Sequence, residues 1–452
     1  MAEAPGTPVP RSHPAAMAPG HAASTPAAAT PAGKLRPLLL QRDFAALWWG
    51  QLISLWGDRI NYLALNGLVQ QHTRDYHDAA QSSLMLSLHG TVSVLPVLLF
   101  APFAGPWVDR WNLRRVLIVS DVLRALLVLT IPIVYAATHL AAPVWSMVFL
   151  LFTCNVFFLP AKSAITPEIV APGQLLAANT LLSIAGIVAT AVGALLGGWL
   201  VDNVGWKTAL WVDAGTYMAS VFSIALIRYR AEIREAAPFA TVGGYFREIG
   251  DGLLVVRRSA PVGLALTALA ALWVGGGFMH VAGNQHIQRA ASVPGMERIG
   301  ILMAVLGVGS GLGTWWVNAK GKGLPRPLLL GVGLFLAGGW IFGFAVSSRF
   351  AVFAIAAFLI GLCIAPAFIL TETLLQEGTD LRTRGRVFSL RDFAMRLAFQ
   401  VAIWIAALLT PLVGHGATLI VAAALVSLAG VLSMLWGRRA PELMGSGPAP
   451  GG

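Results

Sequence analysis

Several ionisable residues lie inside long apolar runs, where a charge costs at least about 2.5 kcal/mol at the centre of a membrane. Asp58 has the clearest pattern, because the polar residues around it fall within about a third of the circumference of a helix. This stripe consists of Gln51, Ser54, Asp58, Asn61 and Tyr62. The pattern predicts that the stripe lines a cavity in which Asp58 carries a proton or binds a cation. The alternative is a structural role for Asp58, through a hydrogen bond or an ion pair with Arg59.

A second set of polar residues has the spacing of one helix face. Asp392, Arg396 and Gln400 lie four residues apart, and Arg396 lies about 15 Å inside the expected helix. Arg396 therefore needs a carboxylate, either Asp392 alone or Asp392 alternating with another acid as a cavity opens and closes. Glu372 is a further candidate for proton coupling, with a gate or snorkelling role as the alternative.

Other polar residues in apolar runs favour structural roles. Asp121 and Arg124 have the i, i+3 spacing of a local ion pair. His89 and His280 can carry protons near neutral pH, but single histidines favour hydrogen bonds between helices. We expect no metal site, no cofactor and no enzymatic activity, because the sequence shows neither a nucleophile with a base partner nor a phosphate loop.

The elements that hold these residues are membrane helices. Hydrophobic residues make up 57% of the 452 residues and charged residues 11%, and the mean hydropathy is +0.73. Soluble domains carry roughly 25% charged residues. Twelve apolar stretches are long enough to span a bilayer. They lie near 44–70, 84–107, 116–137, 143–161, 176–201, 207–227, 261–283, 299–318, 327–346, 350–374, 387–412 and 416–436.

The net charge of +11 follows the predicted topology. Most arginines and lysines fall in the tails and in alternate connections, and Lys162 is assigned to the connection after the fourth stretch. This distribution predicts that both termini are cytoplasmic, and it argues against nucleic acid as a partner.

The longest polar connection divides the chain into two halves of six stretches. We predict disordered cytoplasmic tails at 1–35 and 439–452, bundles at 36–228 and 261–438, and a cytoplasmic linker at 229–260. The joins GPWVDRWNLRR and VNAKGKGLPRP are equivalent in layout and about 210 residues apart. The prediction is an all-α membrane protein with twelve transmembrane helices in two six-helix bundles.

The first join resembles a signature of the major facilitator superfamily, which implies the major facilitator fold. The matching residues are Gly105, Asp109, Arg110, Arg114 and Arg115. In that family the loop latches the cytoplasmic gate, and its aspartate meets the start of the eleventh helix, where Arg384 and Arg386 stand here. The alternative is a basic cluster that only fixes topology.

Three further stretches, 44–65, 155–181 and 366–390, are similar to the branch that contains macrolide and siderophore exporters. The resemblance implies a secondary active transporter that works by alternating access. We expect proton-coupled efflux of a small amphipathic or hydrophobic organic compound, drug-like or siderophore-like. Ala194 replaces a proline typical of drug antiporters, which weakens the inference of antiport.

The expected energy source is the proton gradient, and the expected partners are the substrate, protons and the lipid bilayer. The expected location of the chain is the bacterial inner membrane, as a monomer. Alternatives are a lipid or lysolipid flippase, an uncoupled facilitator, and a membrane scaffold or sensor that transports nothing.

Overall fold

The computed structural model describes residues 36–73, 78–171, 173–229, 241–290, 295–320, 325–379 and 381–439. These residues form helices joined by short connections, with no strand among them, which confirms the predicted fold class. The predicted tails lie outside the described residues, except Arg439 at the end of the last helix. The helices are α1 (Arg36–Leu39), α2 (Arg42–His72), α3 (Ala79–Val108), α4 (Leu113–Thr138), α5 (Ala141–Ile169), α6 (Leu175–Val204), α7 (Trp206–Ala225), α8 (Val242–Arg258), α9 (Ala260–Phe278), the π-helical turn η2 (Met279–Gly283), α10 (Asn284–Ala290), α11 (Met296–Lys320), α12 (Arg326–Val346), α13 (Phe350–Glu377), α14 (Leu381–Val413) and α15 (His415–Arg439).

Within the described ranges, ten helical segments are long and apolar enough to cross a membrane. Two more of the predicted spans correspond to α2 and α7, which carry Asp58 and Asp213 in their central parts. Both helices pack inside the N-terminal bundle, where protein rather than lipid surrounds much of their surface. This packing explains how helices of lower hydropathy can belong to a membrane bundle.

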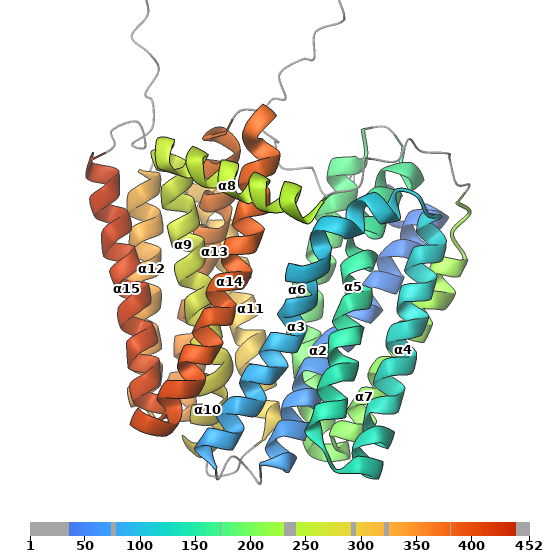
Figure 1. The fold of residues 1–452 in the computed structure, drawn as a ribbon, viewed down its shortest axis with the longest axis horizontal. Coiled ribbons are helices and arrows are strands. Elements are labelled where there is room, and N and C mark those ends of the chain that lie inside the picture. Colours follow the sequence, from blue (N-terminus) through green and yellow to red (C-terminus); the bar gives the residue numbers. More distant parts are fainter. Residues whose placement is uncertain are drawn as a thin grey trace, which may run out of the picture.

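The helices form two bundles that stand side by side, α2 to α7 and α9 to α15 (Figure 1). Helix α8 belongs to the predicted linker and lies across one end of the C-terminal bundle (Figure 1). We call this end the α8 face and the opposite end the distal face. Arg228, just after α7, donates its backbone N–H to Asp43 at the start of α2 (3.0 Å). The first and last spans of this bundle therefore meet at the same face.

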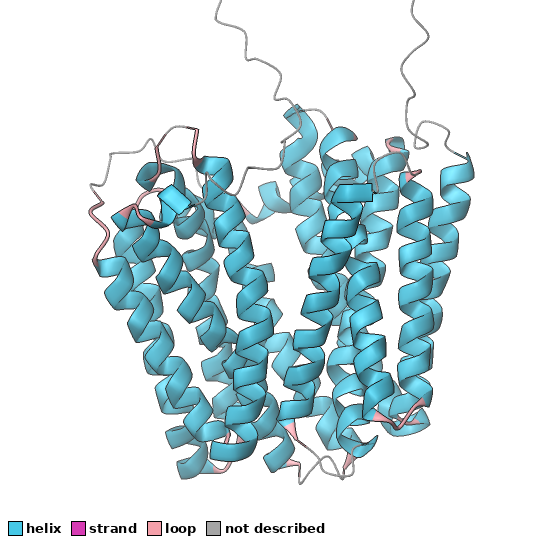
Figure 2. Ribbon diagram, turned by 180° about the vertical axis from the view of Figure 1, so that it is seen from behind, coloured by secondary structure: helices cyan, strands magenta, loops and turns pink. Residues whose placement is uncertain are grey.

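The most extensive contacts between the bundles are those of α3 with α14 and of α6 with α11. Gly300 of α11 lies against the backbone of Ala194 in α6, where a Cβ atom would overlap the Ala194 carbonyl oxygen. Ser87 of α3 donates to the Ile403 carbonyl of α14 (3.1 Å). Seen from behind, the two bundles remain distinct bodies along their length (Figure 2). The polar contacts between them lie in the middle and distal parts of the helices.

Candidate functional site

A cluster of charged side chains occupies the interior of the N-terminal bundle, where α2, α4 and α7 pack together. Helix α7 can approach α2 closely because residue 57 is glycine, and a Cβ atom there would overlap side-chain oxygens of Asp213 and Thr216. The next residue, Asp58, faces the same interface. The cluster consists of Asp58 from α2, Asp121 and Arg124 from α4, and Asp213 and Tyr217 from α7.

Arg124 is the central cation of this cluster. It forms an ion pair with Asp121, as the i, i+3 spacing predicts, and its Nη1 atom lies 4.0 Å from Asp58 Oδ1. Its guanidinium group lies over the rings of Phe158 (4.4 Å) and Tyr217 (4.6 Å). Arg124 and Asp121 are 2% and 0% exposed, so the charges are shielded from water and held by each other and by aromatic faces.

Asp58 lies at the edge of the cluster, and 36% of its side chain is exposed. The Tyr217 hydroxyl donates a hydrogen bond to Asp58 Oδ1 (2.6 Å). The Cβ atom of the expected alternative partner, Arg59, lies close to Gly193 of α6, and Arg59 forms no ion pair with Asp58 in this structure. Among the described residues, Arg124 is the cation that forms an ion pair with Asp58.

Asp213 belongs to the cluster and was missed by the sequence analysis. Its carboxylate is fully buried and accepts hydrogen bonds from Asn61 Nδ2 (2.8 Å) and Thr216 Oγ1 (3.2 Å). Both donors are neutral. An acid in the middle of the stretch 207–227 was the signal that could have found it.

The predicted cavity stripe is only partly correct. Gln51 and Asn61 are buried at 2% and 4% exposure, and Asn61 points to α7 rather than into a cavity. Lys162 also differs from expectation, because it is half-buried within α5. It is close enough to Asp58 and Arg124 to interact electrostatically with both. Asn61 can be accommodated in the interior because Asp213 on α7 accepts its hydrogen bond.

A second group of charges lies between α13 and α14, and its centre is Arg391. Arg391 forms ion pairs with Glu372 and with Asp392, whose Oδ1 atom lies 2.8 Å from Arg391 Nη2. Arg396 forms no ion pair with the described residues in this conformation, because Asp392 pairs with Arg391 instead. Gln400 faces the other bundle and donates to Thr91 Oγ1 (2.6 Å). Sequence spacing favoured the i, i+4 partner, but the adjacent arginine reaches both acids.

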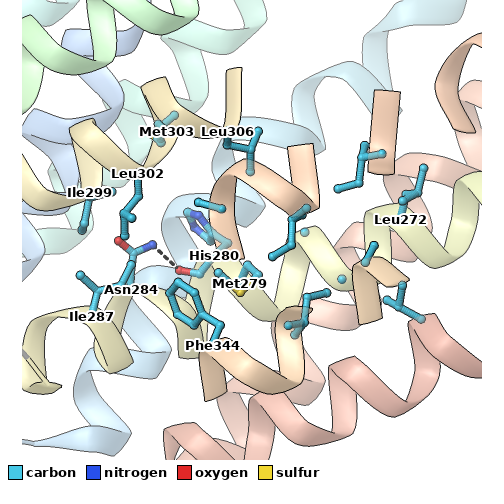
Figure 3. Close-up of a pocket in the computed structure, with 18 of the residues that line it drawn as sticks. Leu272, Met279, His280, Asn284, Ile287, Ile299, Leu302, Met303, Leu306 and Phe344 are labelled. Atoms are coloured by element: carbon cyan, nitrogen blue, oxygen red, sulfur yellow. Dashed lines mark hydrogen bonds between the residues drawn. The ribbon is translucent and has the colours of Figure 1, made fainter. Parts of the chain in front are cut away.

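The C-terminal bundle contains a pocket of about 360 Å³, shown in Figure 3. Its lining side chains are apolar except for three, Tyr62, His280 and Asn284, and no lining residue is charged. The residues that line it are Tyr62, Leu272, Gly275, Gly276, Met279, His280, Asn284, Ile287, Ile299, Leu302, Met303, Leu306, Ala337, Ile341, Phe344, Ala357, Ile360, Ile364, Phe399 and Val426.

His280 connects this pocket to the N-terminal bundle. Its Nε2 atom lies 3.0 Å from the Leu86 carbonyl, and its Nδ1 atom lies 3.0 Å from the Tyr62 hydroxyl. A carbonyl can only accept, so Nε2 carries a proton, and in the neutral ring Tyr62 donates to Nδ1. The expected hydrogen bond between helices is thus confirmed for His280. Asn284 donates to the His280 carbonyl (2.7 Å; Figure 3), which fixes the orientation of its amide.

The predicted contact of the latch between Asp109 and Arg386 is not formed in this structure. Asp109 ends α3 and has no ion pair among the described residues, and Arg386 pairs instead with Asp251 of α8 (3.3 Å). The Arg384 side chain lies outside the described part of the structure.

The other motif residues make local contacts or none. Arg114 donates to the carbonyls of Ile224 (3.3 Å) and Ala225 at the end of α7, and Arg110 donates to the Pro106 carbonyl. A Cβ atom at Gly105 would meet no other atom within 4 Å. In this conformation, therefore, nothing packed nearby requires a glycine at position 105.

The distal face has a contact of the type expected for the latch. Asp202 of α6 accepts the backbone N–H groups of Met296 and Glu297, each at 2.8 Å. These residues begin α11, so a carboxylate of one bundle caps a helix of the other. The sequence analysis did not identify Asp202.

Two helical bundles in a membrane, one with a buried charge cluster and one with an apolar pocket, define a membrane transporter rather than an enzyme. The sequence profile of the Major Facilitator Superfamily matches residues 47–321. The chain belongs to this superfamily, as the motif at 105–115 indicated.

Curated relatives and solved structures agree with this assignment. Macrolide efflux protein A of Streptococcus pyogenes is 27% identical over 392 residues, which cover 82% of this chain and 90% of that protein. The putative bacilysin exporter BacE of Bacillus subtilis is 26% identical over 371 residues, covering 78% and 86%. A bacterial homologue of the human lysosomal transporter Spinster, solved in an inward-facing and unoccupied conformation, has a TM-score of 0.67 at 12% identity. That alignment covers 93% of this chain and 100% of the other, and it supports the fold.

Proposed function

We propose that this transporter exports a small amphipathic or hydrophobic organic compound in exchange for protons. In this proposal it lies in the bacterial inner membrane with the α8 face in the cytoplasm and needs no bound cofactor. The observation that carries the proposal is Asp58, a partly exposed carboxylate at the edge of a buried charge cluster. The relatives named for macrolide efflux and bacilysin export support the direction and the kind of substrate.

The charge balance of the cluster supports proton coupling. Asp58, Asp121 and Asp213 face the cations Arg124 and Lys162, so the fully ionised set carries one negative charge in excess. An unbalanced charge in a buried site is unfavourable, and one bound proton would remove it. Asp58 can exchange that proton with water because its side chain is partly exposed. Asp213 accepts hydrogen bonds only from neutral donors and is a second carboxylate that can bind the proton.

The pocket of the C-terminal bundle supports the substrate class. Its apolar walls favour a hydrophobic body, and Tyr62, His280 and Asn284 supply the few polar groups that orient a ligand. Tyr62 lies one helical turn after Asp58 on α2, so the pocket and the charge cluster share a helix. Movement of α2 would couple proton binding to the shape of the pocket.

The contacts between bundles support alternating access. At the distal face Asp202 holds α6 to α11, whereas at the α8 face Asp109 and Arg386 are apart. The opposite state would release Asp202 and bring Asp109 to the start of α14. For that contact, Arg386 would leave Asp251.

Purified protein in liposomes that contain a pH-sensitive dye tests the proposal. Macrolides, siderophore-like chelates and lysolipids would be added in turn, with Asp58→Asn as the test variant and Asp78→Asn, at an exposed acid outside the charge cluster and the latch, as the control. We expect one class to move protons in the wild type and in Asp78→Asn, and this movement to be lost in Asp58→Asn. Substrate movement without proton flux in the wild type would indicate a facilitator or flippase instead.

A further inference from the structure

A groove runs along the outside of the N-terminal bundle, between α4 and α5 at the α8 face, with a volume of about 540 Å³. Two of its apolar wall residues, Val119 and Leu123, are 54% and 45% exposed, so the groove opens towards the lipid. The residues that line it are Arg110, Trp111, Asn112, Arg115, Val116, Val119, Ser120, Leu123, Thr153, Cys154 and Phe157.

One end of this groove is positively charged. The Arg115 side chain is exposed and makes no hydrogen bond or ion pair with the described residues. Arg110 also lines the groove, and its guanidinium group donates to the Pro106 carbonyl. Arg114 turns away from the groove and binds the end of α7. Arg115 is therefore the residue of this loop that remains available to an anion.

Aromatic rings frame the charged end. Trp107 stacks on Phe157 with ring centroids 5.9 Å apart, and Trp111 lies 6.2 Å from Phe157. Trp107 and Trp111 are 41% and 52% exposed. Tryptophan favours the level of lipid headgroups, which places Arg115 at the depth of the phosphates.

A matching groove of about 420 Å³ lies in the C-terminal bundle between α11, α12 and α13. Its Trp316 and Cys363 each stand 209 residues after Trp107 and Cys154 of the first bundle. Leucine, valine, glycine, tryptophan and cysteine residues line this second groove, and none of them is charged. The fold thus repeats the groove, and the arginines distinguish the first copy.

We propose that the first groove binds one anionic phospholipid. Arg115, assisted by Arg110, holds the phosphate, and an acyl chain lies along Val119 and Leu123. Arginine forms strong charge-assisted hydrogen bonds with phosphate, and basic pockets between membrane helices bind anionic headgroups. The second groove accepts acyl chains without selecting a headgroup.

Native mass spectrometry of the full-length protein, delipidated in detergent, tests this site. Palmitoyl-oleoyl phosphatidylglycerol or the matching phosphatidylcholine would be added in steps, and the first bound lipid counted. We expect the wild type to bind the first phosphatidylglycerol about tenfold more tightly than the first phosphatidylcholine. Arg115→Gln should reduce this affinity about fivefold, and Arg115→Lys should retain most of it. The control is Arg247→Gln, which removes an exposed arginine from α8 at the same face.

A second pair of variants locates the lipid. Leu123→Trp fills the first groove, and Val332→Trp, 209 residues later, fills the second. We expect Leu123→Trp to weaken phosphatidylglycerol binding and Val332→Trp to leave it unchanged. An equal loss in Arg247→Gln or Val332→Trp, or equal affinity of the wild type for both lipids, overturns the proposal.

Discussion

Asp202 Oδ1 lies 2.8 Å from the backbone nitrogen of Met296, although the two residues belong to different bundles. Its other oxygen accepts the N–H of Glu297, so one carboxylate satisfies the first two donors of α11. The contact closes the distal face without an ion pair. The contact exists only while the bundles are together at the distal face, because their separation would expose both N–H donors.

Asp202→Asn should favour the state that is open at the distal face. The amide keeps one acceptor oxygen and loses the charge that the helix dipole favours, which costs about 1 kcal/mol. The population ratio should therefore shift about fivefold. Distances between spin labels at Ala137→Cys and Ser348→Cys, in a background without the native cysteines, would measure the shift.

The matched control is Asp78→Asn. Asp78 accepts the backbone N–H groups of Ala80 (2.9 Å) and Gln81 (3.0 Å), so it caps α3 within its own bundle. Asp78→Asn should therefore lower the stability of the protein without changing the distance between the spin labels. A shift of equal size in both variants would show that the Asp202 contact has no special role in closing the distal face.

Arg124→Gln should destabilise the protein by about 3 kcal/mol, because it leaves Asp121 buried without its cation. Adding Asp121→Asn should recover part of this loss, since the unpaired carboxylate is then removed. Thermal unfolding of the purified variants in detergent measures both effects. If the losses of stability of the two single variants simply add in the double variant, the two residues do not form a coupled pair.

Double-mutant cycles should distinguish Arg391 from Arg396, both on α14. Arg391→Gln with Glu372→Gln should show a coupling of about 1 kcal/mol, the upper end for a solvent-exposed pair, because Arg391 is 15% exposed although Glu372 is 43% exposed. Arg396→Ala with Asp392→Asn should be additive within about 0.3 kcal/mol. Unfolding free energies give both values, and a larger coupling in the second cycle would restore the i, i+4 pair.

Asp109→Asn should slow transport while leaving thermal stability nearly unchanged. In this conformation the carboxylate makes no ion pair with the described residues, so its removal acts on the state in which the latch closes. Initial transport rates in liposomes and melting temperatures would be compared for each variant. Unchanged transport would remove the latch from the mechanism.

Gly276→Leu should block substrate binding in the C-terminal pocket. Gly276 lines the pocket, and a Cβ atom there meets no other atom within 4 Å, so the new side chain can fill the space without a clash. Gly339→Leu is the control, because that position is equally open but lies outside the pocket lining. Equal binding by both variants would place the substrate elsewhere.

The sequence predicted the fold because apolar length and charge distribution depend on the bilayer, which acts on each helix separately. It predicted the Asp121–Arg124 pair for a similar reason, since i, i+3 neighbours meet within one helix. Asn61 shows the limit of this reasoning. A polar stripe on one helix does not reveal whether a cavity or an acid such as Asp213 faces it.

Partners on different helices were the main omissions. Asp202 meets α11 and Arg391 reaches Glu372 only because the bundles and helices pack in a particular register. No local spacing encodes these contacts. Lys162 was placed outside the membrane because the predicted stretch ended too early, and the helix in fact continues to Ile169.

The π-helical turn η2 shifts the helical frame of the seventh span. In a continuous α-helix Asn284 would stand about 80° from Gly276 around the axis, and Ile287 about 120° from Gly275. The extra residue of the turn reduces both offsets to about 20°, so both halves of the span present one wall to the pocket. Deletion of one residue from η2 would rotate Asn284 and Ile287 by about a quarter turn and remove that wall. A change in chain length by one residue, with almost no change in composition, can therefore alter which compounds the pocket accepts.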